Sequence, residues 1–190
     1  MSGPLVQRIL VAPDDGSLGP LLRIADDRLP PGRGYGRHEH RAVDVVAVVL
    51  AGELRHAWVR DAVLRAGDVA VLRAGAGLEH DEIAGDDGAR VLQTYLRSAA
   101  PTAAPEHEVA EGPRGWVDLE RADALLWVAR LAPGTAAQVP AGLRVVAGPD
   151  DAEVAERPEE EVRAGDGVTT VVVWRLETAR PAWAEEAARD

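Results

Sequence analysis

The chain has 190 residues, of which 46% are hydrophobic and 28% charged, a composition typical of a soluble globular protein. Its 21 basic against 32 acidic residues leave a formal net charge of −11, which disfavours nucleic acid and anionic membranes as partners, and the absence of cysteine excludes disulfides and thiolate chemistry. No apolar run approaches the roughly 18 residues that span a bilayer, and no signal-peptide pattern is present, so we expect a cytoplasmic protein.

Short apolar segments separated by turn-like residues follow one another along most of the chain. Val43–Leu50 is a nearly continuous β-branched run, typical of a strand that is buried on both faces or lines a barrel. Further strands are predicted at Leu54–Val59, Val69–Leu72, Val91–Leu96, Ala124–Leu131, Leu143–Ala147, Glu153–Ala155 and Val168–Leu176, with turns at Ala51–Glu53 and Gly85–Gly88. Ser98–Gly115 is predicted to be a linker, and only Ala182–Arg189 is predicted to be helical. Strands this short and this regularly spaced indicate an all-β sandwich or barrel.

Three turn signatures of the first half recur in the same order in the second half. The pairs are LPPG and LAPG at 29–32 and 131–134, LAG and VAG at 50–52 and 146–148, and RAGD at 65–68 and 163–166. Because the three offsets are similar, the sequence predicts two copies of one β-unit. We place the boundary within the predicted linker, which gives an N-terminal domain of residues 1–113 and a C-terminal domain of residues 114–190.

The candidate metal ligands lie in two short motifs of the first half. His38 and His40 form a His-x-His motif, whose two side chains point to the same face if the segment is a strand. His80 and Glu82 place an imidazole and a carboxylate at the same spacing. A His-x-His motif on its own is more often a solvated turn than a metal site. Two such pairs on neighbouring strands, however, would give three nitrogens and one oxygen around one ion.

The surroundings of both motifs resemble a known family. Gly32 followed after five residues by His38-x-His40 resembles the first motif of the cupin superfamily. From His38 to Glu82 the sequence resembles the N-terminal domain of pirin, a bicupin of that superfamily. The matching stretches are HEHR at 38–41, VLAGEL at 49–54 followed by His56, VLRAGDV at 63–69 and AGAGLEHDE at 74–82. They match without gaps, and the resemblance covers about residues 28–98.

The resemblance implies an all-β bicupin, with two packed β-barrels of the double-stranded β-helix or jelly-roll type. To this fold the tail of the chain adds the short C-terminal helix predicted above. It also implies one mononuclear divalent metal, held by His38, His40, His80 and Glu82. Fe(II) is the usual metal of the family, and Zn, Ni, Cu, Mn or Co would also fit these ligands. No histidine occurs beyond His107, so we expect the C-terminal domain to lack the metal and to have a structural role.

The same resemblance implies an oxidoreductase, a dioxygenase similar to quercetin 2,3-dioxygenase. Its partners would be dioxygen and a small aromatic or enolic hydroxyl compound such as a flavonol, with Glu82 as the catalytic base. Two alternatives stay open: a non-catalytic metal-binding cupin that acts as a redox sensor or regulatory protein partner, and a non-oxidative cupin isomerase. The oligomeric state is also left open.

Four further residues are candidates for the substrate pocket: Tyr35, Arg37, His56 and Tyr95. For His56, a hydrogen-bonded place in the core is the more frequent role of such a residue. Tyrosine and arginine serve surfaces and strands as often as pockets. His107 falls in the predicted linker, where we expect it to be solvated.

Overall fold

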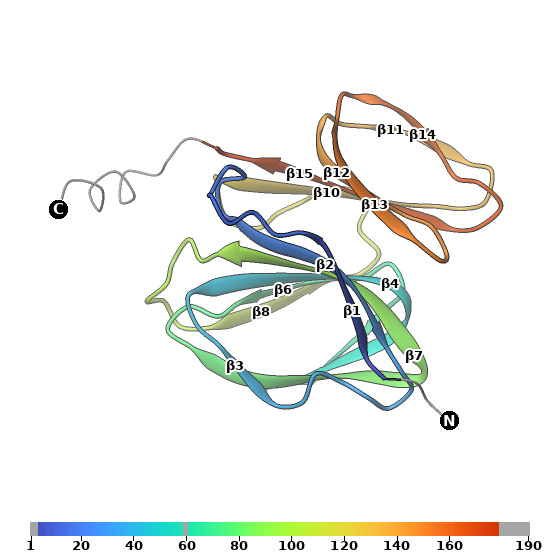
Figure 1. Cartoon of the computed structure of the whole chain (residues 1–190). Helices are drawn as coiled ribbons and strands as arrows, with labels where there is room; N and C mark the ends of the chain where they lie inside the picture. Colours follow the sequence, from blue (N-terminus) through green and yellow to red (C-terminus); the bar gives the residue numbers. More distant parts are fainter. Residues whose placement is uncertain (1–3, 59–60, 179–190) are drawn as a thin grey trace.

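The computed structural model describes residues 4–58 and 61–178. Within these two ranges the regular secondary structure consists of β-strands, without helices (Figure 1). The strands are β1 (Val6–Val11), β2 (Leu21–Leu29), β3 (His38–His40), β4 (Val43–Ala57), β5 (Ala62–Arg65), β6 (Val69–Arg73), β7 (Leu78–Arg97), β8 (Glu106–Ala110), β9 (Gly115–Val117), β10 (Ala124–Leu131), β11 (Ala136–Val139), β12 (Gly142–Ala147), β13 (Ala152–Arg157), β14 (Glu160–Arg163) and β15 (Thr169–Leu176). No helix that could cross a membrane occurs in the described ranges. The helix predicted at Ala182–Arg189 lies outside them.

The first eight strands form the N-terminal half. Its antiparallel sheet has the order β1-β2-β7-β4-β6-β8, with β5 paired to β4 and β3 paired to β7. The alternation of side chains along β4 explains its apolar sequence: Val46 and Val48 face the C-terminal half, whereas Ala47 and Val49 face the inside of the N-terminal barrel. The predicted strand with two buried faces is therefore confirmed.

The C-terminal half repeats this order of strands. Its main sheet runs β13-β12-β15-β10-β9, and β11 pairs with β14. The run β10-β15-β12-β13 corresponds to β2-β7-β4-β6. In both runs the strand that comes last in the sequence, β15 or β7, lies second in the sheet, between the first and the second strand of the sequence. This order supports the predicted duplication. One predicted echo is not equivalent, since the first RAGD segment joins β5 to β6 and the second joins β14 to β15.

An apolar core lies between the two halves. It combines side chains of β2, β4, β6 and β7 with side chains of β10, β12 and β15, among them Ile24, Leu92, Leu126, Val145 and Trp174. The two sheets therefore pack face to face, as the upper and lower layers of Figure 1 show. Two packed all-β halves confirm the predicted fold class.

Several predicted boundaries are wrong for a common reason, which is that long strands bend where the sequence indicates a turn. β4 continues through Gly52 and β7 through Gly85–Gly88, and the register between them shifts beside Gly52. Gly52 has a φ of 72°, and a Cβ there would overlap the carbonyl oxygen of Gly88, so the bend needs glycine. The predicted linker Ser98–Gly115 contains β8, which pairs with β6. Sheet membership changes between β8 and β9, and the domain boundary at 113/114 stays a prediction.

Candidate metal centre

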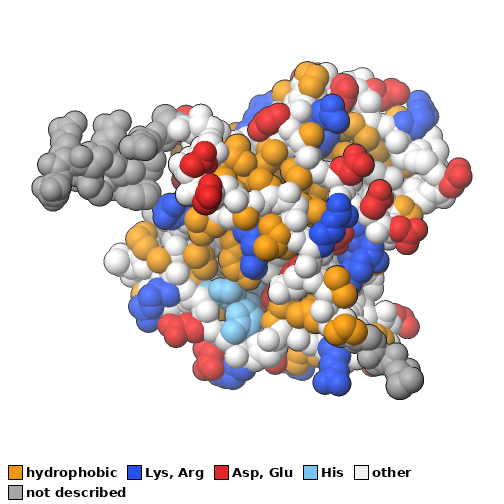
Figure 2. Space-filling model, viewed as in Figure 1, with side chains coloured by type: hydrophobic (Ala, Val, Ile, Leu, Met, Phe, Trp, Pro, Cys, Tyr) orange, Lys and Arg blue, Asp and Glu red, His pale blue; other side chains and the backbone are white. Residues whose placement is uncertain are grey.

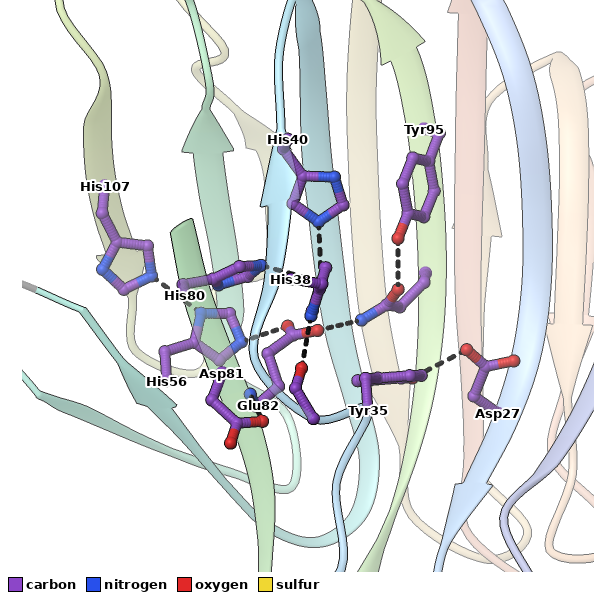
Figure 3. Close-up of polar contacts among 12 residues, drawn as sticks. Asp27, Tyr35, His38, His40, His56, His80, Asp81, Glu82, Tyr95 and His107 are labelled. Atoms are coloured by element: carbon purple, nitrogen blue, oxygen red, sulfur yellow. Dashed lines mark hydrogen bonds and ion pairs between the residues drawn. The ribbon is translucent and has the colours of Figure 1, made fainter. Parts of the chain in front are cut away.

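Three histidines converge at the end of β3. His38 and His40 lie on β3, and the pairing of β3 with β7 places His38 directly opposite His80. Nε2 of His38 lies 3.0 Å from Nε2 of His40 and 3.1 Å from Nε2 of His80 (Figure 3). One ligand nitrogen from each ring lies within 4.8 Å of the other two. The structure thus brings together the three imidazoles that the sequence motifs predict.

A close backbone contact holds the segment before β3 against β7. Gly34 forms a bridge with Ile83, and the amide of Tyr35 donates a hydrogen bond to the carbonyl oxygen of Glu82 at 3.3 Å. A Cβ on Gly34 would overlap that same carbonyl oxygen. Only glycine therefore lets this segment approach β7 closely enough for the histidines of β3 to reach His80.

The protonation of the three rings suits a divalent cation. Nδ1 of His38 lies 2.6 Å from the carbonyl oxygen of Gly36, which can only accept, so Nδ1 carries a proton and Nε2 is the nitrogen left to bind a metal. Burial lowers the pKa of His80 to about 4, and burial together with His38 lowers the pKa of His40. His40 and His80 are therefore neutral near pH 7, the form in which imidazole binds metals. The three histidines could bind one metal ion.

Glu82 lies on the same face of β7 as His80 but is not part of the three-histidine group. Gln93 Nε2 donates a hydrogen bond to Oε2 of Glu82 at 2.8 Å, and Nε2 of His56 lies 2.7 Å from Oε1. The second contact has the distance of an ion pair but not the angles of a hydrogen bond, so Oε1 has no well-directed partner. Burial raises the pKa of Glu82, but His56, His80 and Gln93 outweigh burial and hold it at about 2. Its predicted roles as fourth ligand and base stay predictions.

Two of the residues near the histidines lie on the other face of β7. Glu79 precedes His80, so its side chain points away from the histidines, and Arg37 forms an exposed ion pair with it at 2.9 Å. Arg37 is therefore the one pocket candidate that the structure does not bring to the histidine group. Asp81 also alternates with His80, and its Oδ1 accepts a hydrogen bond from the amide of Glu82 at 2.8 Å.

Both candidate tyrosines lie beside the histidine group. The ring of Tyr95 is 5.6 Å from that of His40, and the ring of Tyr35 is 6.2 Å from that of His38, measured between centroids. The hydroxyl of Tyr35 donates a hydrogen bond to Oδ2 of Asp27 at 2.7 Å. Burial raises the pKa of Tyr95 to about 12 and that of Tyr35 well above its usual range, so both hydroxyls keep their protons at neutral pH.

Three polar residues near the site, one half-buried and two fully buried, were not found from the sequence. His107 lies on β8, where its Nε2 is 3.0 Å from Nδ1 of His56, and burial lowers its pKa to about 4. Its predicted place in a solvated linker is therefore wrong. Gln93 and Asp27 are both fully buried within strands. A polar residue inside an apolar run, such as Gln93 in VLQTYL, was the signal that could have identified them.

The histidines reach the surface of the N-terminal half, as the pale blue side chains in Figure 2 show. His38 and His40 are only partly buried, whereas His80 is 1% exposed. A cavity of about 840 Å³ lies elsewhere, along β1 and the strands β12 to β14, and none of its lining residues is a histidine. The three-histidine group is therefore open to a small ligand from one side.

Comparison with known sequences agrees with this geometry. The family model described as Pirin matches residues 13–96, a segment that contains the three histidines and Glu82. A Zymomonas mobilis protein named "Putative quercetin 2,3-dioxygenase" is 35% identical over 72 residues, which are 37% of this chain and 31% of that protein. Pirin-like protein 2 of Arabidopsis thaliana is 28% identical over 96 residues, which are 50% of this chain and 30% of that protein. The chain therefore spans about a third of the length of these relatives.

Comparison with solved structures extends the likeness to most of the chain. The nickel(II) complex of the bacterial pirin YhhW from Escherichia coli has a TM-score of 0.63 at 17% identity, and the match covers 91% of this chain and 94% of that one. A quercetin 2,3-dioxygenase from Acinetobacter baumannii has a TM-score of 0.64 at 18% identity, and the match covers 98% and 89%. At such identities the likeness establishes the fold, and with the sequence match it confirms the resemblance read from the motifs.

Proposed function

We propose that this chain, whose residues 13–96 form a pirin domain, is a metal-dependent oxidoreductase that uses dioxygen to oxidise a small aromatic or enolic hydroxyl compound such as a flavonol. The proposed ligands of the metal are His38, His40, His80 and Glu82, and the proposed metal is Fe(II). The names of the relatives, which include quercetin 2,3-dioxygenases, support this choice of reaction.

One observation carries the proposal, namely the convergence of three imidazoles beside one ionised carboxylate. Imidazole and carboxylate ligands that leave open positions are typical of non-haem iron oxygenases. When bound, such a metal supplies Lewis-acid and redox chemistry at this place. The same ligands also suit zinc, nickel, copper, manganese or cobalt, so the metal is a matter for measurement.

In this proposal Glu82 moves the proton of the substrate. Its Oε1 has no well-directed hydrogen bond and can accept the proton of a substrate hydroxyl, while Gln93 holds Oε2 in place at 2.8 Å. A pKa of about 2 keeps the carboxylate ionised at neutral pH, which is the form that has a free lone pair for the substrate proton. Glu82 therefore combines a fixed position with an available oxygen.

The surroundings of His40 favour a flat, partly apolar substrate. Tyr95 packs on the apolar cluster that includes Val45, Leu72 and Leu78, and its ring faces His40. An aromatic compound placed beside the histidines would contact this apolar side, while its hydroxyl would point toward Glu82. This arrangement supports an aromatic or enolic hydroxyl compound over a sugar or an aliphatic acid.

Dioxygen uptake tests the proposal. Protein loaded with Fe(II) without oxygen is mixed with quercetin, other flavonols and catechols, and oxygen and substrate are followed together. We expect matched loss of one compound of this panel and of dioxygen, and no uptake by His80→Ala. If the wild-type protein keeps its metal but consumes no dioxygen with any of these compounds, the proposed oxidation by dioxygen is refuted and a non-catalytic metal-binding role is favoured.

A further inference from the structure

His107 has a neighbour that its position in the chain does not indicate. β8 pairs with β6, with His107 opposite Leu72, and this pairing brings its ring to His56 on β4. The two ring centroids are 5.0 Å apart, and Nε2 of His107 is 3.0 Å from Nδ1 of His56. His56 is only 3% exposed, so its ring cannot turn to water for a replacement partner.

The contact extends a continuous line of polar side chains past the histidine group, drawn with dashed lines in Figure 3. The hydroxyl of Tyr95 donates to Oε1 of Gln93 at 3.2 Å, and Gln93 donates to Oε2 of Glu82. On the other side of the carboxylate stands Nε2 of His56, followed by His107. Glu82 is therefore held from two sides, by Gln93 directly and by a pair of imidazoles.

The proton count of this line shows what His107 does. An ionised carboxylate oxygen and an imidazole lone pair would repel each other at 2.7 Å, so Nε2 of His56, the nitrogen on the side of Glu82, carries a proton, although the contact lacks the angles of a hydrogen bond. The other nitrogen, Nδ1, then faces Nε2 of His107, and one proton lies between these two atoms whichever ring carries it. Without His107, Nδ1 of His56 would be a buried polar atom without a partner, which destabilises this orientation of the ring.

We propose that His107 is a positioning residue for Glu82, which it orients by fixing the ring of His56. The role assigned to Glu82 rests on the proposed function, whereas the contact between the two imidazoles does not. His107 touches neither substrate nor the three-histidine group. Its contact with the site is the ring of His56.

A double-mutant cycle on metal affinity tests this route. His107→Leu removes the polar contact at similar size, His107→Gln keeps a group that can pair with Nδ1 of His56, and Glu106→Gln is a matched control on the same strand. With Zn(II) as the probe, we expect His107→Leu to weaken binding about tenfold, and His107→Gln and Glu106→Gln to change it by less than about twofold. In a Glu82→Gln background, His107→Leu should have no further effect. An equal loss in both backgrounds, or none in the wild-type background, overturns the proposal.

Nitrogen NMR of metal-free protein with labelled histidine gives a readout that does not depend on the metal. We expect a proton on Nε2 of His56, and a shift of its Nδ1 resonance in His107→Leu but not in His107→Gln. An unchanged Nδ1 resonance in His107→Leu overturns the inference even if the wild-type protein binds metal. If the wild-type protein binds no metal, the proposed function fails and these spectra alone decide on His107. His107→Ser, which cannot reach Nδ1, replaces His107→Leu should the latter not fold.

Discussion

Glu82 and Asp81 are neighbours in the sequence, but β7 points their side chains to opposite faces. We predict that Glu82→Gln keeps the three imidazoles and much of the metal but lowers turnover at least about 100-fold, the lower end of what a positioned base contributes. Asp81→Asn, the matched control, should change turnover by less than about twofold, because it has no place beside the substrate. Dioxygen consumption and metal content are measured on both variants.

The opposite pattern would be informative. Wild-type turnover in Glu82→Gln would show that Glu82 is not the base and is at most a ligand. Damage confined to Asp81→Asn would show that the register of β7 is shifted by one residue, and that the histidine group is misplaced with it.

One buried and one half-buried histidine make acid stability a second test. Burial lowers the pKa of His80 and of His107 to about 4, whereas an unfolded histidine titrates near pH 6.5. Between these values the unfolded chain binds more protons than the folded one, so the free energy of unfolding falls as pH drops from about 6.5 to 4. We predict this loss in metal-free protein followed by thermal unfolding, and a smaller loss in His107→Gln. An identical pH dependence in the two proteins would refute the assignment for His107.

The candidate histidine ligands could be predicted because their spacing alone decides which way they point. His38 and His40 are two residues apart, and in any strand such residues share a face. His107 could not be predicted, because its partner His56 is 51 residues away and the two meet only through the pairing of β4, β6 and β8. Local sequence carries no information on that pairing.

At the scale of elements, the site depends on how closely the segment before β3 approaches β7. Gly34→Ala would place a methyl group against the carbonyl oxygen of Glu82. We predict a loss of about 1–3 kcal/mol in unfolding free energy, as for other overpacked sites, together with weaker Zn(II) binding. Gly165→Ala is the control, because a Cβ there meets nothing within 4 Å. Denaturant unfolding and metal titration compare the two, and equal effects would mean that the close contact does not shape the site.

Most strand positions could be predicted, whereas their lengths and several of their ends could not. The strand at Ala124–Leu131 agrees with β10, because its apolar pattern stops where the strand stops. β4 and β7 are longer than predicted because Gly52 and Gly85–Gly88 bend them without reversing the chain. In both cases the residue type indicates a change of direction, but only the closure of the barrel decides whether the strand ends there.

At the scale of the whole molecule, Arg90 links the two halves. Its guanidinium forms two hydrogen bonds with the carboxylate of Asp26, at 2.8 and 2.7 Å, and also donates to the carbonyl oxygens of Gly148 and Pro149 in the C-terminal half. Arg90 and Asp26 are 5% and 3% exposed. Removing one partner of such a pair leaves a buried charge without compensation.

We therefore predict that Arg90→Met lowers the free energy of unfolding by about 3–5 kcal/mol, and that adding Asp26→Leu to it recovers part of the loss. Chemical denaturation of the single and double variants measures both values. A double variant that is no more stable than Arg90→Met would show that the carboxylate of Asp26 does not destabilise the single variant. Arg90 would then stabilise the contact between the two halves through packing and not through its charge.

The most direct test of the metal centre is elemental analysis of the whole chain, prepared without a metal-affinity tag, loaded with a divalent metal and freed of excess ions. We predict one equivalent of metal per chain in the wild-type protein and a large loss in His38→Ala and in His80→Ala, because each supplies one of the three converging nitrogens. Glu106→Gln should keep its full equivalent. No bound metal in the wild-type protein, or a full equivalent in His80→Ala, would contradict a metal site built on these histidines.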